Sequence, residues 1–136
     1  MAGNSIHISG FGINVDDLDR SVEFYTKALG LQETMKLDLG ELHEVMVAGD
    51  GDRPAILLVK HADRTSAPEP GSGFEKIVLV TEAVDTLYER VVANGGTSEK
   101  APFHIEKMGI RVALVRDPDG YLIELIEQQP GAAATP

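Results

Sequence analysis

The sequence predicts an α+β protein made of two tandem copies of one β-α-β-β-β unit. Three observations carry this prediction: a pattern that returns after 65 positions, a linker rich in Pro, Gly and Ser, and a last stretch that alternates as a strand does. We assign residues 1–60 to the first module, 61–73 to the linker, 74–129 to the second module and 130–136 to a flexible tail. At 136 residues, the two modules are expected to share a core and to form one structural domain.

The first unit opens with a predicted strand over residues 6–15. Asp16 and Asp17 are good N-cap residues, and an apolar stripe at helical spacing then predicts a helix that stops at Gly30. Strands are predicted next over residues 31–39, 42–48 and 55–60.

The second unit repeats this order. A strand over residues 76–80 precedes a helical stripe that ends near Gly95, and strands are then predicted over residues 98–106, 110–115 and 121–128. Val80 corresponds to Val15 and Gly95 to Gly30, and both pairs are 65 positions apart. A spacing that holds from the strand to the helix end indicates an internal repeat.

The last predicted strand carries one carboxylate in an apolar setting. Asp117-Pro118-Asp119-Gly120 has the residues of a turn, because proline presets φ and glycine adopts conformations that a Cβ forbids. In the run that follows, Leu122, Glu124 and Ile126 share one face. A carboxylate in such a position is costly, so Glu124 is expected to have a hydrogen-bond donor, a cation, a metal or a proton to compensate it.

Composition excludes several classes of function. The formal net charge of −10 would repel nucleic-acid phosphates and anionic lipid, so the expected partner is a small molecule or another protein. The chain has no cysteine, which rules out disulfides, thiolate metal sites and a cysteine nucleophile. No signal-peptide layout and no membrane-spanning run is apparent, and we expect a cytoplasmic protein.

Three stretches of the chain resemble a known protein family: Asn14-Val-Asp-Asp-Leu-Asp-Arg-Ser-Val-Glu-Phe-Tyr25, Ala28-Leu-Gly-Leu31 and Asp117-Pro-Asp-Gly-Tyr-Leu-Ile-Glu-Leu-Ile-Glu127. They resemble the vicinal oxygen chelate superfamily, also called the glyoxalase, bleomycin-resistance and extradiol-dioxygenase superfamily, and the last stretch is most similar to glyoxalase I. The resemblance spans residues 6–128. It implies that each unit forms part of a curved mixed sheet around a cavity, and that members of this chain length pair as homodimers.

The resemblance also implies four inward-facing positions that hold a divalent metal in the catalytic members. Gly10 takes the first position, and an apolar residue among Leu57, Leu58 and Val59 takes the second. The repeat spacing puts Glu75 at the third position, and Glu124 matches the family's Glu at the fourth. We therefore expect Glu75 and Glu124 to be the candidate metal ligands, and two carboxylates alone usually make a weak site.

Two functions remain open at this point. In one, the chain is a lyase or isomerase acting on a small carbonyl or oxygenated metabolite, although not a standard glyoxalase I, with Glu124 and His104 as candidate acid/base residues. In the other, it is a metal-free binding protein of the bleomycin-resistance type, whose acidic cavity takes a cationic or polar antibiotic or metabolite.

Overall fold

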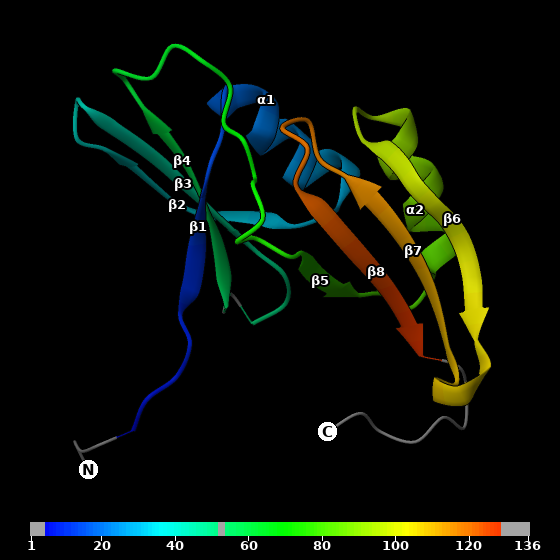
Figure 1. Ribbon diagram of the computed structural model, residues 1–136. Helices are drawn as coiled ribbons and strands as arrows, with labels where there is room; N and C mark the ends of the chain where they lie inside the picture. Colours follow the sequence, from blue (N-terminus) through cyan, green and yellow to red (C-terminus); the bar gives the residue numbers. More distant parts are fainter. Residues whose placement is uncertain (1–4, 52–53, 129–136) are drawn as a thin grey trace.

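The computed structural model of the chain describes residues 5–51 and 54–128, so the predicted tail lies outside the described residues. Two four-stranded sheets dominate it, with the strand orders β1-β4-β3-β2 and β5-β8-β7-β6 (Figure 1). The first sheet contains β1 (Gly10–Asn14), β2 (Gln32–Asp38), β3 (Leu42–Ala48) and β4 (Ala55–His61). The second contains β5 (Ile77–Val80), β6 (Thr97–Ile105), β7 (Ile110–Arg116) and β8 (Leu122–Gln128). In both sheets the first strand of the unit pairs in parallel with the last, which confirms the predicted repeat.

The helices differ in one turn. In the first unit α1 (Leu18–Glu23) continues as a π-helix, η1 (Phe24–Ala28), and the second unit has the regular helix α2 (Val84–Ala93). The N-caps Asp17 and Ala83 are 66 positions apart, whereas Gly30 and Gly95 at the helix ends, both with positive φ, are 65 apart. The first helix therefore holds one extra residue, and a π-helical turn is the usual way to accommodate one.

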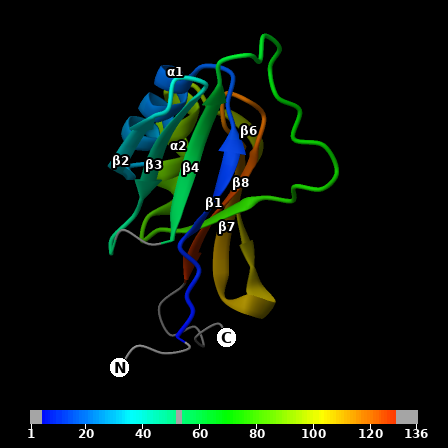
Figure 2. The same ribbon diagram turned by 90° about the vertical axis from the view of Figure 1, so that its left-hand side faces the viewer.

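One apolar core joins the two units. The side chains that face α1 and α2 from the two sheets belong to a single buried cluster, which includes Leu58 and Leu125. Within residues 5–51 and 54–128, neither α1 nor α2 covers the opposite face of either sheet, to which every second side chain of a strand points. Figure 2 shows this arrangement for the first sheet, with β1 and β4 in front and the two helices behind. No helix within the described residues is long and apolar enough to span a membrane.

The first strand is shorter than predicted. The paired strand begins at Gly10, and residues 5–9, which precede it, extend away from the sheet (Figure 1). Ile6 and Ile8 are consequently exposed. Residues 62–76, which cover most of the predicted linker, form a loop that connects β4 to β5.

Candidate functional site

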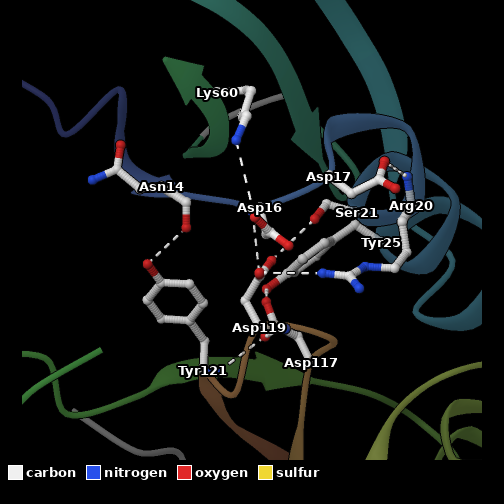
Figure 3. A network of polar contacts seen from close by, with 10 residues as sticks. All are labelled: Asn14, Asp16, Asp17, Arg20, Ser21, Tyr25, Lys60, Asp117, Asp119 and Tyr121. Atoms are coloured by element: carbon white, nitrogen blue, oxygen red, sulfur yellow. Dashed lines mark hydrogen bonds and ion pairs between the residues drawn. The ribbon is translucent and has the colours of Figure 1, made fainter. Parts of the chain in front are cut away.

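The turn before β8 fixes where that strand begins. Asp117 Oδ1 accepts hydrogen bonds from the backbone N–H groups of Asp119 and Tyr121, both at 2.9 Å. Its other carboxylate oxygen accepts a hydrogen bond from the Tyr25 hydroxyl at 2.6 Å (Figure 3). The predicted turn is thus closed by its own aspartate and anchored to η1, and β8 leaves it in a defined direction.

Asp119 ties the same turn to α1. Its carboxylate accepts hydrogen bonds from the Arg20 guanidinium and from the Ser21 hydroxyl, each at 3.3 Å (Figure 3). The Tyr121 hydroxyl donates to the backbone carbonyl of Asn14, at the end of β1, over 2.8 Å. The turn of the second unit is therefore bonded to the strand and the helix of the first, and its aspartates serve as structural anchors.

Glu124 has the compensating partner that the sequence requires, and this partner is a cation. Lys76 Nζ lies 3.1 Å from Glu124 Oε1. The Glu124 side chain keeps 17% of its surface exposed and that of Lys76 keeps 34%, so the pair is partly shielded and still reachable from solvent. An ion pair of this kind contributes more than a fully exposed one, because solvent screens it less.

Lys76, rather than Glu75, occupies the position in the second unit that Gly10 occupies in the first. The N–H of Val15 donates to the carbonyl of Val59, and the N–H of Thr81 donates to that of Ile126 in the equivalent bond. Val15 and Thr81 are therefore equivalent and lie 66 positions apart, and the residue 66 positions after Gly10 is Lys76. The constant spacing of 65 is therefore wrong before the helices, because the extra residue of the first helix follows this strand.

Glu75 lies one residue before Lys76 and is exposed. The sequence gives no signal for the correct register, since Ile77 and Leu79 alternate with Val78 and Val80 and both pairs are apolar enough to face the core. Metal binding by Glu75 stays a prediction, and the register supports Lys76 as the neighbour of Glu124.

The other two expected ligand positions lie on the first sheet. The residue of the first unit that corresponds to Glu124 is Leu57, which pairs with Gly12 and Met46. Leu58 is fully buried in the core. A Cβ on Gly10 would collide with the backbone carbonyl of Ala55. The glycine thus permits a close approach of two strands, and no larger side chain fits there without a shift of the backbone.

The residues at these four positions do not fit a divalent metal. Glycine and leucine offer no donor atom, a lysine ammonium donates hydrogen bonds and accepts none, and only Glu124 carries lone pairs. Divalent ions in proteins take several oxygen or nitrogen ligands, so one carboxylate is insufficient. Within residues 5–51 and 54–128 no group of three or more His, Cys, Asp or Glu side chains is placed to hold a metal.

The surface around the ion pair is largely apolar. We call the side of the second sheet that faces away from α2 the open face. Register and alternation place four charged residues on it, Lys76, Lys100, Arg116 and Glu124, among apolar ones, namely Val78, Val80, Phe103, Val112, Leu114, Leu122 and Ile126. Val78, Glu124, Leu114 and Lys100 follow one another across the four strands in register. The Lys100 ammonium lies 4.1 Å from the centre of the Phe103 ring. The open face thus carries three cations, of which Lys76 is paired with Glu124 and Arg116 with Glu99 at 2.9 Å.

A small hollow adjoins Lys76. It has a volume of about 150 Å³ and is lined from the first unit by Phe11 and Ile56 and from the second by Lys76 and Val78. This volume is below the several hundred Å³ of typical ligand pockets.

His104 does not lie with Glu124. It pairs with Arg111, whose guanidinium is bonded to Asp85 at the start of α2 over 2.8 Å. This places His104 on the side of the sheet that α2 covers, where its side chain is exposed. Two register shifts in β6 before Phe103 change which side of the strand a residue faces, and the sequence does not reveal them. The two candidate acid/base residues are thus separated by the sheet.

Comparison with known proteins identifies the family. The model of the glyoxalase/bleomycin resistance protein/dioxygenase superfamily matches residues 6–125. The chain belongs to this superfamily. A lactoylglutathione lyase of Arabidopsis thaliana is 34% identical over 119 residues, which cover 85% of this chain and 42% of that protein. A probable lactoylglutathione lyase of Synechocystis is 33% identical over 85% of this chain and 90% of its own length.

The solved structures agree on the fold. A glyoxalase I mutant of Zea mays superimposes with a TM-score of 0.81 at 24% identity, over 90% of this chain and 44% of that one. The chain therefore spans less than half of the Arabidopsis and maize relatives, and it has the glyoxalase-type fold that the sequence predicts.

Proposed function

We propose that this superfamily member binds a small, oxygen-rich organic anion on the open face of the second sheet, without a metal ion. The observation that carries the proposal is the ion pair of Lys76 and Glu124 at two of the four expected ligand positions. Lys100 adds a second cation to the same face of a chain whose net charge is −10. A locally cationic, largely apolar surface favours an organic anion over the cationic ligand expected from the sequence.

Calorimetric titration of the purified chain with small carboxylates tests this proposal. We expect a carboxylate such as pyruvate to bind, a quaternary ammonium compound of similar size to bind far more weakly, and Lys76→Met to lower the carboxylate affinity about tenfold, the equivalent of 1.4 kcal/mol. Lys27→Met is the matched control, because Lys27 also pairs with a glutamate, Glu23, at 3.6 Å but is exposed on α1 and η1. Equal binding of anions and cations, or equal losses in the two variants, would contradict the proposal.

Elemental analysis of protein purified without a chelator or His tag tests the metal-free part. We expect less than stoichiometric divalent metal in the purified chain, and no change in Glu124→Ala or Glu75→Ala. About one ion per chain that disappears in both variants would show that the two carboxylates recruit further ligands.

A second candidate is the lactoylglutathione lyase reaction, which the two curated relatives favour by name. Against it stand Gly10, Leu57 and Lys76 at three expected ligand positions. We propose that the chain does not perform this reaction. Isomerisation of the methylglyoxal-glutathione hemithioacetal at an enzyme-like rate, with nickel or zinc added, would overturn this part of the proposal and restore the metal-dependent reading.

A further inference from the structure

We propose that the cavity between the two units is a second binding site, which takes a short zwitterionic peptide with apolar side chains along the free edge of β5. The cavity has a volume of about 650 Å³, which lies within the size range of ligand pockets. Its lining comes from both units and includes neither Lys76 nor Glu124, so it is distinct from the ion pair on the open face. The inference therefore goes beyond the proposed function and does not depend on it.

The strand β5 offers main-chain groups to this cavity. It is an edge strand of the second sheet and pairs only with β8 in the described part of the chain (Figure 1). The N–H of Thr81 bonds to β8, and a parallel ladder alternates, so the N–H and C=O groups of Val78 and Val80 point away from β8. Val78, Leu79 and Val80 all line the cavity, which therefore follows the edge itself. An extended peptide pairs with such an edge through its own main chain.

Arg90 gives the cavity a fixed cation. Its Nε donates a hydrogen bond of 2.7 Å to the carbonyl of Ala28, at the end of η1. Its Nη2 lies against Gly30, since a Cβ added to that glycine would be 2.9 Å from it. No carboxylate within residues 5–51 and 54–128 pairs with Arg90, although Arg20 and Arg116 each have one. The first unit thus orients the guanidinium, whose remaining N–H groups are available to the carboxylate of a ligand.

Asp50 adds an anion, and Leu31 connects the two charged parts of the lining. Leu31 follows Gly30, and its Cδ2 lies 3.8 Å from the position of a Cβ on Gly49, the neighbour of Asp50. Among the described residues, Asp50 pairs with no cation, Arg90 included. A ligand that reaches both groups needs a carboxylate and an ammonium several bonds apart. The two ends of a dipeptide meet this need, because an extended chain spans about 3.3–3.6 Å per residue.

The rest of the lining suits the side chains and amides of such a peptide. Leu79 and Leu87 are apolar, and Thr81 and Thr86 add hydroxyl groups. The Thr81 hydroxyl accepts a hydrogen bond of 3.1 Å from the N–H of Ala83, so its own hydrogen can be donated to a peptide carbonyl. Burial of apolar ligand side chains against the leucines adds to the binding free energy.

Calorimetric titration of the full-length chain with leucyl-leucine tests the site, and two blocked analogues are the matched probes. N-acetyl-leucyl-leucine keeps the carboxylate and lacks the ammonium, whereas leucyl-leucinamide keeps the ammonium and lacks the carboxylate. We expect leucyl-leucine to bind, and each analogue to bind about tenfold more weakly, because each loses a hydrogen bond between charged groups. This comparison needs no variant, so it stands even where a substitution prevents folding.

Two variants assign the charges to their residues. Arg90→Gln should lower the affinity for leucyl-leucine about tenfold and leave that for leucyl-leucinamide unchanged, since the amide has no carboxylate to bind. Asp50→Asn should lower the affinity for leucyl-leucine by a similar factor and leave that for the N-acetyl analogue unchanged. Arg64→Gln and Asp63→Asn are the matched controls, because both residues are exposed in the loop after β4 and lie outside the cavity lining. Circular dichroism checks that every variant is folded.

Three results would overturn the proposal. The first is an absence of leucyl-leucine binding, or equal binding of all three ligands, either of which leaves anion binding on the open face in place. The second is competition by pyruvate, which would put the peptide on the open face instead of in the cavity. The third is a peptide affinity that falls as the protein concentration is raised, which would make a second copy of the chain the occupant of the β5 edge.

Discussion

Asp117 is an acidic residue whose surroundings at first suggest catalysis. Burial raises the pKa of its carboxyl, and burial beside Asp117 likewise raises the pKa of the Tyr25 hydroxyl. Both side chains are almost completely enclosed, and both carboxylate oxygens already accept hydrogen bonds from the chain. A perturbed pKa indicates a functional site only where a ligand can reach the group, so we assign this pair to the joint between the two units.

Tyr25→Phe should destabilise the protein by about 2 kcal/mol, because a buried carboxylate loses a hydrogen-bond donor. Urea denaturation followed by circular dichroism measures this change. Tyr88→Phe is the control, since the Tyr88 hydroxyl makes a bond of 2.7 Å to Ser98 that is exposed to solvent. A loss in Tyr88→Phe as large as in Tyr25→Phe would argue against an anchoring role for the buried bond.

The raised pKa of Asp117 also predicts a pH dependence of stability. In the folded state the pKa of its carboxyl lies above the ordinary value of 3.8, chiefly because burial disfavours the charged form. The contribution of this group is therefore complete below the unfolded pKa and is lost as the pH rises through the folded pKa. In Asp117→Asn this contribution is absent, so the free energy of unfolding of the parent minus that of the variant should fall as the pH rises from about 4 to 7. Urea titrations at several pH values measure it, and a difference that stays constant or grows would show that the native pKa is not raised.

At the scale of elements, the sequence predicts the order of strands and helices and fails on one register. Alternation and turn residues suffice for β3 and β8, since their side chains must face one apolar core. The π-helical turn of η1 changes the spacing between the units by one residue, and no local pattern in the sequence marks it. Because of that single residue, Lys76 rather than Glu75 lies beside Glu124. The sequence therefore predicts that the Glu124 carboxylate needs a compensating partner, but it does not predict which residue this is.

Gly10 gives an element-scale prediction. Gly10→Ala should destabilise the protein by about 2–3 kcal/mol, because its Cβ would meet the Ala55 carbonyl and separate β1 from β4. Gly12→Ala is the matched control in the same strand: the nearest atom to its added Cβ is Val59 Cγ2 at 3.6 Å, an ordinary contact. We expect the control to change stability by no more than about 0.5 kcal/mol. Thermal unfolding of the two variants compares them, and equal losses would mean that the strand approach is not tight at Gly10.

At the scale of the whole molecule, the two units are joined by a turn and a core and still leave apolar surface uncovered. Asp119 and Tyr121 bond the second unit to α1 and β1, and the core cluster spans both units. The sequence predicts this joint only as a turn, because hydrogen bonds between residues about 100 positions apart depend on the complete fold. Ile6 and Ile8 before β1 and Val80 on β5 remain largely exposed. Edge strands with exposed apolar side chains favour association with another chain.

The homodimer expected from the family resemblance stays a prediction, and these exposed residues make it testable. Sedimentation velocity should give about twice the chain mass of 14.6 kDa. The double variant Ile8→Glu, Val80→Glu should shift the mass toward the monomer, because charged side chains are costly to bury in the interface. Leu39→Glu is the control, since Leu39 is also largely exposed but lies at the turn between β2 and β3. A monomeric parent chain would contradict the dimer, and a dimer that both variants preserve would place its interface on another surface.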